Sequence, residues 1–311
     1  MFCQGERAVY GGVLMKVLNF GSLNIDYIYK VRHFVQKGET QASDMLSIYG
    51  GGKGLNQSVA LSRAGAEVYH AGVIGTDGAF LKEILEEAGV NTKFTQELQN
   101  VRTGHAIIQN DSAGDNCIIL YGGANQEITK EFVDNVIEGF GSGDWLVLQN
   151  EINEIPYIAS RAHEKGMKIV LNPSPVNEKI FEINLSYIDY FILNEGEGQA
   201  LAGAEADGPA LISKLSEKFP GAEIVLTLGE RGSVYTGKEG IAWQDAYKAD
   251  VTDTTAAGDT FTGYFMAGRL EGMPVKEALD MASKASALAV TKKGAAMSIP
   301  MKEEVLDFKV K

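Results

Sequence analysis

Two aspartates flank a run of small residues in the segment DTTAAGDT (253–260). The sequence that follows, FTGYFMAG, predicts a long helix that begins within this run. Small residues at a helix start let a ligand approach the backbone N–H groups of Ala256, Ala257 and Gly258, where the helix dipole favours negative charge. The segment therefore predicts an anion hole directly before Asp259.

The carboxylate of Asp259 would repel a phosphate group bound at this helix start. The conflict disappears if Asp259 takes a proton from an attacking hydroxyl while the amides hold the charge that develops on the transferred group. An acidic residue in the first turn of a helix is also a common stabilising feature, worth about 1 kcal/mol. Taken alone, that structural explanation is the preferred one.

A second glycine cluster, GGGKGLNQ (50–57), carries a single cation, Lys53, and opens another predicted helix. It is not a Walker A loop, because Gly54 stands where a serine or threonine would bind magnesium. The absence of a GxGxxG motif also weighs against a dinucleotide oxidoreductase. A flexible turn is the ordinary explanation, but a turn needs one or two glycines rather than four.

A pair of polar residues follows the first predicted strand, in the segment GSLNID (21–26). Asn24 and Asp26 are two residues apart and so face the same side of an extended chain. A carboxylate accepts two vicinal hydroxyls, and an amide both donates and accepts, so the pair suits a polyol such as a sugar. Asn and Asp also form turns, and from these residues alone the two explanations are equally good.

Charge and composition restrict the class of partner. The 311 residues include 28 basic and 41 acidic side chains, a formal net charge of −13. This argues against nucleic acid or an anionic membrane as a partner, because both need a basic surface. Two cysteines are too few for a disulfide framework and are typical of a reducing cytoplasm, where we expect the protein to act. No apolar run approaches the roughly 20 residues that span a bilayer.

Short apolar runs alternate with amphipathic ones from Met15 onward, which is typical of a parallel sheet covered by helices. We expect one α/β domain over residues 15–311, a three-layer α/β/α fold with a mainly parallel central sheet, preceded by an N-terminal extension (1–14). The predicted helices include 78–89 and 157–166. The predicted strands are 15–21, 66–75, 144–149, 168–172, 189–194 and 223–229.

Two segments, about 27–49 and 102–121, break this alternation. Both show alternating apolar and polar residues separated by turn-forming residues, which predicts antiparallel strands. Such strands do not easily join a parallel layer, so we expect a small antiparallel β-sheet that projects from the domain. It could be a lid, a dimer surface or both.

The motifs together resemble those of the PfkB sugar kinases. Seven segments occur in that family's order, from about Met15 to Pro300: GSLNID, GGGKGLNQ, LNPSP, NEGE, TLGERG, DTTAAGDTF and VTKKGAAMSIP. The resemblance implies an ATP-dependent kinase for a small sugar, with Mg²⁺ accompanying ATP.

The resemblance also implies roles for individual residues. Asp259 would be the catalytic base, beside an anion hole formed by Ala256, Ala257 and Gly258. Asn194 and Glu197 would serve magnesium and phosphate, with Glu197 acting through metal-bound water. Thr227 and Gly229 would bind the nucleotide. The residues at sugar-binding positions are Asn24, Asp26, Gly52, Lys53, Asn56 and Glu151.

A potassium site is a further implication of the resemblance. In this family the late loop lies against the DTTAAGD segment and encloses a monovalent cation. Oxygen-only ligation suits such a hard ion, which could fix the anion hole without touching substrate. The backbone carbonyls would be those of Thr255, Ala289, Lys292 and Gly294, and the side-chain oxygens those of Asp253 and Ser298.

The leading hypothesis is phosphorylation of the primary hydroxyl of D-ribose to give D-ribose 5-phosphate. The projecting sheet would close over the sugar and exclude water, and its outer face would form a homodimer contact. The same chemistry on fructose, deoxyribose or a nucleoside is the nearest alternative. A non-catalytic sugar or nucleotide sensor is the alternative from another class.

Overall fold

The computed structural model describes residues 9–10, 13–113 and 115–309. Two short strands at its start, β1 (Val9–Tyr10) and β2 (Val13–Leu14), pair with each other in antiparallel orientation. The rest of the expected N-terminal extension lies outside the described residues.

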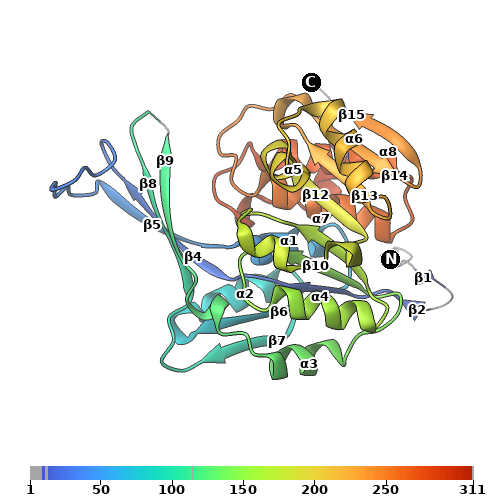
Figure 1. Cartoon of the computed structure of the whole chain (residues 1–311). Coiled ribbons are helices and arrows are strands. Elements are labelled where there is room, and N and C mark those ends of the chain that lie inside the picture. Colours follow the sequence, from blue (N-terminus) through green and yellow to red (C-terminus); the bar gives the residue numbers. More distant parts are fainter. Residues whose placement is uncertain (1–8, 11–12, 114, 310–311) are drawn as a thin grey trace, which may run out of the picture.

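A nine-stranded sheet forms the centre of the described chain (Figure 1), in the order β15-β14-β13-β12-β11-β10-β3-β6-β7. Its strands from β13 to β7 run parallel, and β14 and β15 add an antiparallel edge. The strands are β3 (Val17–Phe20), β6 (Val68–Gly75), β7 (Asn91–Leu98), β10 (Trp145–Gln149), β11 (Lys168–Asn172), β12 (Tyr190–Asn194), β13 (Glu223–Thr227), β14 (Ser233–Gly237) and β15 (Gly240–Gln244).

The central strands are apolar on both faces because helices cover both faces. Every residue of β3 and β10 is buried. All six strands predicted from the sequence are present, whereas β7, β14 and β15 were not predicted. The predicted helices 78–89 and 157–166 correspond to α2 and α4, and the helices predicted to begin at the glycine cluster and within 253–260 correspond to α1 and α7.

Each face of the sheet packs against helices and forms its own hydrophobic core. The helices of one core are α1, α2, α7, α8 and α9, and those of the other are α3, α4, α5 and α6. The three-layer α/β/α prediction is confirmed. The helices are α1 (Lys53–Arg63), α2 (Ala79–Glu87), α3 (Lys130–Ile137), α4 (Ile155–Glu164), α5 (Glu195–Ala202), α6 (Gly208–Lys218), α7 (Ala257–Leu270), α8 (Val275–Ala289) and α9 (Lys302–Leu306). Short 3₁₀ turns are η1 (Thr76–Gly78), η2 (Gly123–Gln126), η3 (Glu178–Glu182), η4 (Leu185–Tyr187), η5 (Gly229–Arg231) and η6 (Ala296–Ser298).

A separate four-stranded sheet projects from the domain (Figure 1), in the order β5-β4-β8-β9. We call it the lid. The projecting, largely antiparallel sheet that the sequence predicted is confirmed: β4–β5 and β8–β9 are antiparallel hairpins, and the two hairpins are joined through a parallel pairing of β4 with β8. Both hairpins leave the domain along their first strand, and these two outgoing strands lie side by side. The strands are β4 (Asn24–Lys30), β5 (Met45–Gly51), β8 (Gly104–Asn110) and β9 (Asn116–Tyr121).

The strand order reverses between β3 and β10. From β3 the chain proceeds through α1 to β6 on one side, and from β10 it proceeds through α4 to β11 on the other. In open α/β sheets, ligands bind outside the carboxyl ends of the strands at such a switch point. Within the described residues, no helix is long and apolar enough to cross a membrane.

Candidate active site

Asn24 and Asp26 lie at the switch point, at the start of β4. They begin the lid rather than ending the first strand of the main sheet, because β4 follows β3 after a short connection. Asn24 is buried, and its Oδ1 accepts a hydrogen bond of 2.7 Å from Asn125 Nδ2. A Cβ on Gly51, in the neighbouring strand, would lie 2.0 Å from Asp26 Oδ2. The side chain of Asp26 therefore requires a glycine beside it.

The carboxyl groups of Asp26 and Glu151 are close enough to repel each other when both are charged. Burial, reinforced by repulsion from Glu151, raises the pKa of Asp26 to about 7. Burial also raises the pKa of Glu151, although Lys53 and the hydroxyl of Ser22 offset part of that effect. Two neighbouring carboxyl groups with raised pKa values mark a functional-site candidate.

The glycine cluster at 50–54 brings the start of α1 against the connection between β3 and β4. Gly52 has φ +92°, and a Cβ on Gly54 would lie 2.3 Å from the backbone nitrogen of Ser22. The Ser22 hydroxyl donates to Glu151, and it accepts from the Gly54 amide at 3.2 Å. The Lys53 amide donates to Glu151 Oε2 at 2.9 Å. At these positions the glycines allow close approach of the backbone.

Lys53 is partly buried among acidic groups. Burial opposes its charge, but Asp259, Glu151 and Glu197 attract that charge, and together they raise the pKa of Lys53 above its ordinary value. The three carboxylates come from α7, the segment after β10 and α5. Lys53 is thus a positive charge that interacts both with Glu151, at the candidate sugar site, and with Glu197, at the candidate nucleotide site.

Asp259 lies in the first turn of α7 and is only 6% exposed. Its Oδ2 accepts from Asn56 Nδ2 at 2.9 Å, and its Oδ1 accepts from Gln57 Nε2 at 2.9 Å. The buried Asn56 Oδ1 has no partner among the described residues. An unpaired buried acceptor is costly, so this oxygen suits a ligand hydroxyl.

The start of α7 is open beside Asp259. Ala256 has a left-handed conformation with φ +60°, and the Ala257 amide donates to the Thr254 carbonyl at 3.2 Å. Within the described chain the amides of Ala256 and Gly258 have no recorded backbone acceptor. A Cβ on Gly258 would meet no atom within 4 Å. Two of the three expected anion-hole amides are therefore available.

Asn194 and Glu197 form a capping box at the start of α5. Asn194 Oδ1 accepts from the Glu197 amide at 2.9 Å, and Glu197 Oε2 accepts from the Asn194 amide at 3.0 Å. This pair therefore has a structural function in addition to any ligand contact. Thr227 is the register partner of Asn194 at the ends of β13 and β12. Gly229 follows with φ +60° and open space around its Cβ position.

The two segments expected to enclose potassium are in contact. Asp253 Oδ2 accepts from the Gly294 amide at 3.1 Å, and its Oδ1 accepts from the Thr255 amide at 2.9 Å. These bonds outweigh burial and lower the pKa of Asp253. The Ala289 carbonyl accepts from the Lys292 amide at 3.1 Å, and Lys292 Nζ pairs with Glu304 at 2.8 Å. The hydroxyl of Ser298 is buried and donates to the Ala295 carbonyl at 2.8 Å.

Several polar residues around the site were not predicted as site residues. Ser22 and Asn125 hold Glu151 and Asn24, and Gln57 contacts Asp259 directly. Ser22 and Gln57 lie inside the motifs GSLNID and GGGKGLNQ, so their available signal was membership of a motif. For other residues it was a polar residue at the end of an apolar strand. Gln149 and Asn172 are examples, since each ends a buried strand of the main sheet.

The fold and this group of polar residues define a class of protein. A buried carboxylate beside open amides at a helix start, at the carboxyl edge of a doubly wound sheet, suits group transfer to a hydroxyl. The family model described as pfkB family carbohydrate kinase matches residues 15–302. The chain therefore belongs to the pfkB family, and it is an ATP-dependent carbohydrate kinase.

Individual relatives agree in fold over nearly the whole chain. A ribokinase of Staphylococcus aureus (strain COL) is 36% identical over 300 residues, covering 93% of this chain and 98% of the relative. An Arabidopsis thaliana ribokinase complexed with ribose and ATP has a TM-score of 0.84 at 28% identity, and the match covers 95% of this chain and 99% of that one. A ribokinase from Cryptococcus neoformans var. grubii serotype A in complex with ADP has a TM-score of 0.82 at 32% identity, covering 94% and 99%.

Proposed function

We propose that this kinase transfers the γ-phosphate of ATP to the primary hydroxyl of D-ribose, giving D-ribose 5-phosphate. The similarity to ribokinases over most of the chain supports the substrate. The candidate site offers several groups to a small polyol, including Asp26, Glu151 and Asn56, whose Oδ1 is buried and unpaired among the described residues. Asn24 and Lys53 complete the polar set.

Asp259 acts in this proposal as the base that removes the proton from the attacking hydroxyl. The observation that carries the proposal is its location: a buried carboxylate, held through both oxygens, next to the open helix start at Ala256 and Gly258. The amides of that helix start neutralise charge on the transferring phosphoryl group.

The acidic residues fit a magnesium ion that arrives with the nucleotide. No group of three or more His, Cys, Asp or Glu side chains in the described residues could hold a metal. Magnesium commonly keeps several waters and binds substrate phosphates rather than an all-protein cage. Glu197, held by Asn194, would contact metal-bound water, and the ion would supply charge neutralisation at the phosphates.

We propose that potassium binds between two loops, the one before α7 and the one after α8. The hydrogen bond between Asp253 and Gly294 connects these loops. Carbonyl and side-chain oxygens suit a hard monovalent ion. Thr255 and Ser298 add oxygen atoms on the two sides of the site. The ion would fix the conformation of the anion hole that follows Thr255 in sequence.

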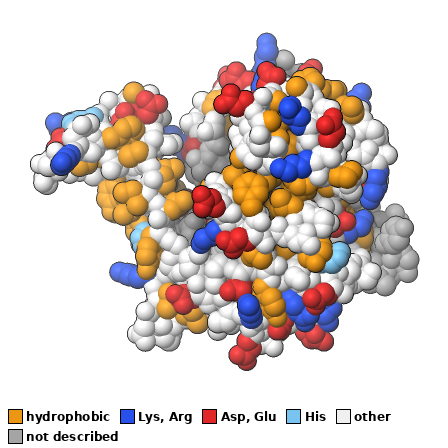
Figure 2. Space-filling model, in the orientation of Figure 1, with side chains coloured by type: hydrophobic (Ala, Val, Ile, Leu, Met, Phe, Trp, Pro, Cys, Tyr) orange, Lys and Arg blue, Asp and Glu red, His pale blue; other side chains and the backbone are white. Residues whose placement is uncertain are grey.

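The outer face of the lid is the proposed contact of a homodimer. This is the face opposite Asn24 and Asp26, and residues in register across the sheet share it. Figure 2 shows hydrophobic side chains gathered on the projecting sheet. On the outer face, five large hydrophobic side chains are exposed: Leu46, Ile48, Ile107, Ile119 and Tyr121.

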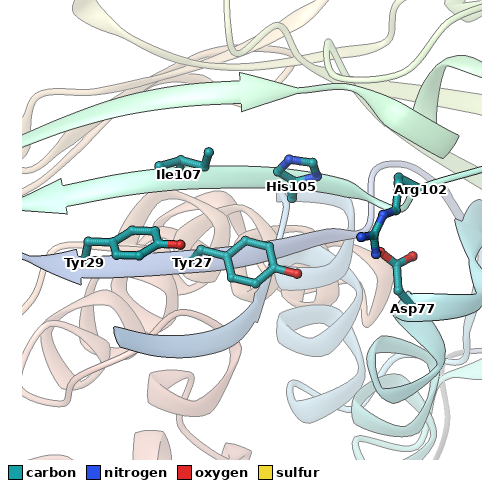
Figure 3. Close-up of a pocket in the computed structure, with 6 residues that line it drawn as sticks. All are labelled: Tyr27, Tyr29, Asp77, Arg102, His105 and Ile107. Carbon is teal, nitrogen blue, oxygen red and sulfur yellow. The ribbon is translucent and has the colours of Figure 1, made fainter. Parts of the chain in front are cut away.

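A cavity of about 240 Å³ lies at the base of this outer face. Tyr27, Tyr29 and Ile107 line it, and the ion pair of Arg102 and Asp77, 2.9 Å between Nη1 and Oδ2, closes one end (Figure 3). The cavity lies away from the candidate active site, and it could receive an apolar side chain of a second copy.

The test of the substrate is an ADP-release assay with ATP and Mg²⁺ over ribose, deoxyribose, fructose and nucleosides, each with potassium and with sodium. Selective, potassium-stimulated turnover of ribose is the expected result. Turnover of another compound would replace the substrate and keep the chemistry. No turnover of any compound would support the sensor hypothesis instead.

Asp259→Asn tests the proposed base. Removing a general base typically costs about 10²–10⁴-fold in rate, so we expect turnover to fall by at least about 100-fold while ribose binding, measured by calorimetry, persists. Turnover at the wild-type rate would show that another group acts as the base.

A further inference from the structure

A continuous chain of buried polar side chains crosses the main sheet and ends at Asp259. Each link is a hydrogen bond of 2.7–2.9 Å, and the donors and acceptors come from β3, β6, β10 and α1. All five members are at most 1% exposed. In order, the chain is His70, Ser58, Asn19, Gln149 and Gln57.

Gln57 is the member that touches Asp259, and its amide group is fully used. Its Nε2 donates to Asp259 Oδ1 at 2.9 Å and to Asn172 Oδ1 at 3.2 Å. Its Oε1 accepts from Gln149 Nε2 at 2.7 Å. A glutamine amide has two donor hydrogens and one acceptor oxygen, so these three bonds determine its orientation.

The reversed orientation of this amide is excluded by the same partners. Turning Gln57 over would place its oxygen against the Asp259 carboxylate and its nitrogen against the nitrogen of Gln149. Asn19 prevents Gln149 from adapting, because Asn19 Oδ1 also accepts from Gln149 Nε2, at 2.9 Å. Asn19 is held in turn by the Gly54 carbonyl, at 2.8 Å.

We propose that Gln57 is a positioning residue for the proposed base Asp259, and that Gln149 orients Gln57 for this task. The inference rests on the proposed function. Asn56 holds the second oxygen of Asp259 and also lies in the sugar-site candidate, whereas Gln57 is fully buried and its amide is held by protein partners. Gln57 therefore affects the orientation of the carboxylate without contacting sugar. Small errors in such an orientation can cost about 100-fold in rate.

Gln57→Glu is the sharpest test because it preserves shape and adds a carboxyl group beside Asp259. Two carboxyl groups in contact share a proton near neutral pH. The other charged groups that face Asp259 are Lys53 and, beyond it, Glu151. We expect kcat at pH 7 to fall about 100-fold and to recover partly at alkaline pH, so that the acidic limb of the kcat profile moves up by about one pH unit or more. KM for the sugar should stay within about 3-fold.

Gln149→Met is the second variant, since it leaves Gln57 in place but removes the donor that orients it. Loss of this restraint should lower kcat about 10-fold, with KM for the sugar unchanged and no displacement of the pH profile. Gln199→Glu is the matched control. It makes the same chemical change in α5, where Gln199 Nε2 donates to the Ala206 carbonyl at 2.9 Å, and it should leave both profiles unchanged. Thermal unfolding checks that each variant is folded.

The outcomes separate the two hypotheses. Suppose that the wild-type chain phosphorylates a sugar. The positioning role would then be overturned by an unchanged pH profile in folded Gln57→Glu, or by equal changes in kcat and KM. A wild-type chain that phosphorylates no sugar would overturn the proposed function, and this inference with it.

Discussion

Asp26 illustrates the conflict between ligand binding and stability at a single residue. A carboxylate suits vicinal hydroxyls, but burial and Glu151 raise its pKa to about 7 from 3.8. Between these values the folded chain holds a proton that the unfolded chain releases. The contribution of Asp26 to stability is therefore greatest below about pH 4 and is lost as the pH rises to about 7.

Asp26→Asn should therefore raise the melting temperature at pH 8, by about 1–2 °C if removing the buried charge stabilises this 311-residue chain by roughly 1 kcal/mol. The difference from wild type should shrink toward pH 4, because Asp26 is then protonated in the folded chain. Scanning fluorimetry across this pH range measures it, and ribose binding should weaken in the same variant.

Asp44→Asn is the control for the Asp26 variant, since it removes the same charge from an exposed position of the lid segment. It should not alter the melting temperature in a pH-dependent way. An Asp26→Asn effect of equal size at pH 4 and pH 8 would contradict the proposed cause.

Residue identities could be predicted where a motif marks them, and not where only the folded chain brings them together. Asn56 and Asp259 belong to motifs 203 positions apart, and they are 2.9 Å apart in the structure. Gln149 belongs to no motif. Its one signal is that a polar residue ends an apolar strand, and that does not say that its side chain contacts Gln57. Such contacts depend on which strands are neighbours.

The start of α7 permits a prediction at the scale of an element. Gly258 occupies the second position of this helix, and a Cβ there would meet no protein atom within 4 Å. Gly258→Ala should therefore stabilise the fold by about 0.5–1 kcal/mol, because glycine is a poor helix former. The added methyl would occupy the space proposed for the transferring phosphoryl group. Turnover should fall by about 100-fold or more if that amide stabilises the transition state.

Urea unfolding and steady-state kinetics measure the two effects of Gly258→Ala. Gly141→Ala is a suitable control, since its Cβ also meets nothing within 4 Å and it precedes the amino end of β10, whereas the candidate site lies at the carboxyl ends of the strands. It should leave turnover unchanged. A Gly258→Ala enzyme with normal kcat would mean that phosphate is held elsewhere.

The elements themselves differ in how far the sequence predicts them. The central strands are short apolar runs between turn signals, so their existence was clear. The parallel pairing of β4 with β8 could not be predicted from the sequence. Alternation of apolar and polar residues predicts a strand, but neither its partner nor its direction. The edge strands β14 and β15 are partly exposed and lack the uniform apolar pattern of β10.

At the scale of the whole molecule, the lid leaves an unusual amount of apolar surface exposed. Its sheet has two open edges, β5 and β9, and the outer-face residues Ile48 and Ile119 are 53% and 63% exposed. Large exposed apolar patches and free strand edges normally indicate an interaction surface. A two-fold contact would cover the same face in both copies.

Ile48→Asp and Ile119→Asp should each separate the proposed dimer, because a carboxylate would then be buried without a partner in both copies at once. Size-exclusion chromatography with light scattering should give twice 33.5 kDa for the wild type and 33.5 kDa for the variants. Ile241→Asp is the control, since Ile241 is 66% exposed on β15, outside the lid. A wild-type mass of 33.5 kDa would refute the dimer. If the lid needs its partner to stay ordered over the candidate site, the monomeric variants should also show a raised KM for ribose with a smaller change in kcat.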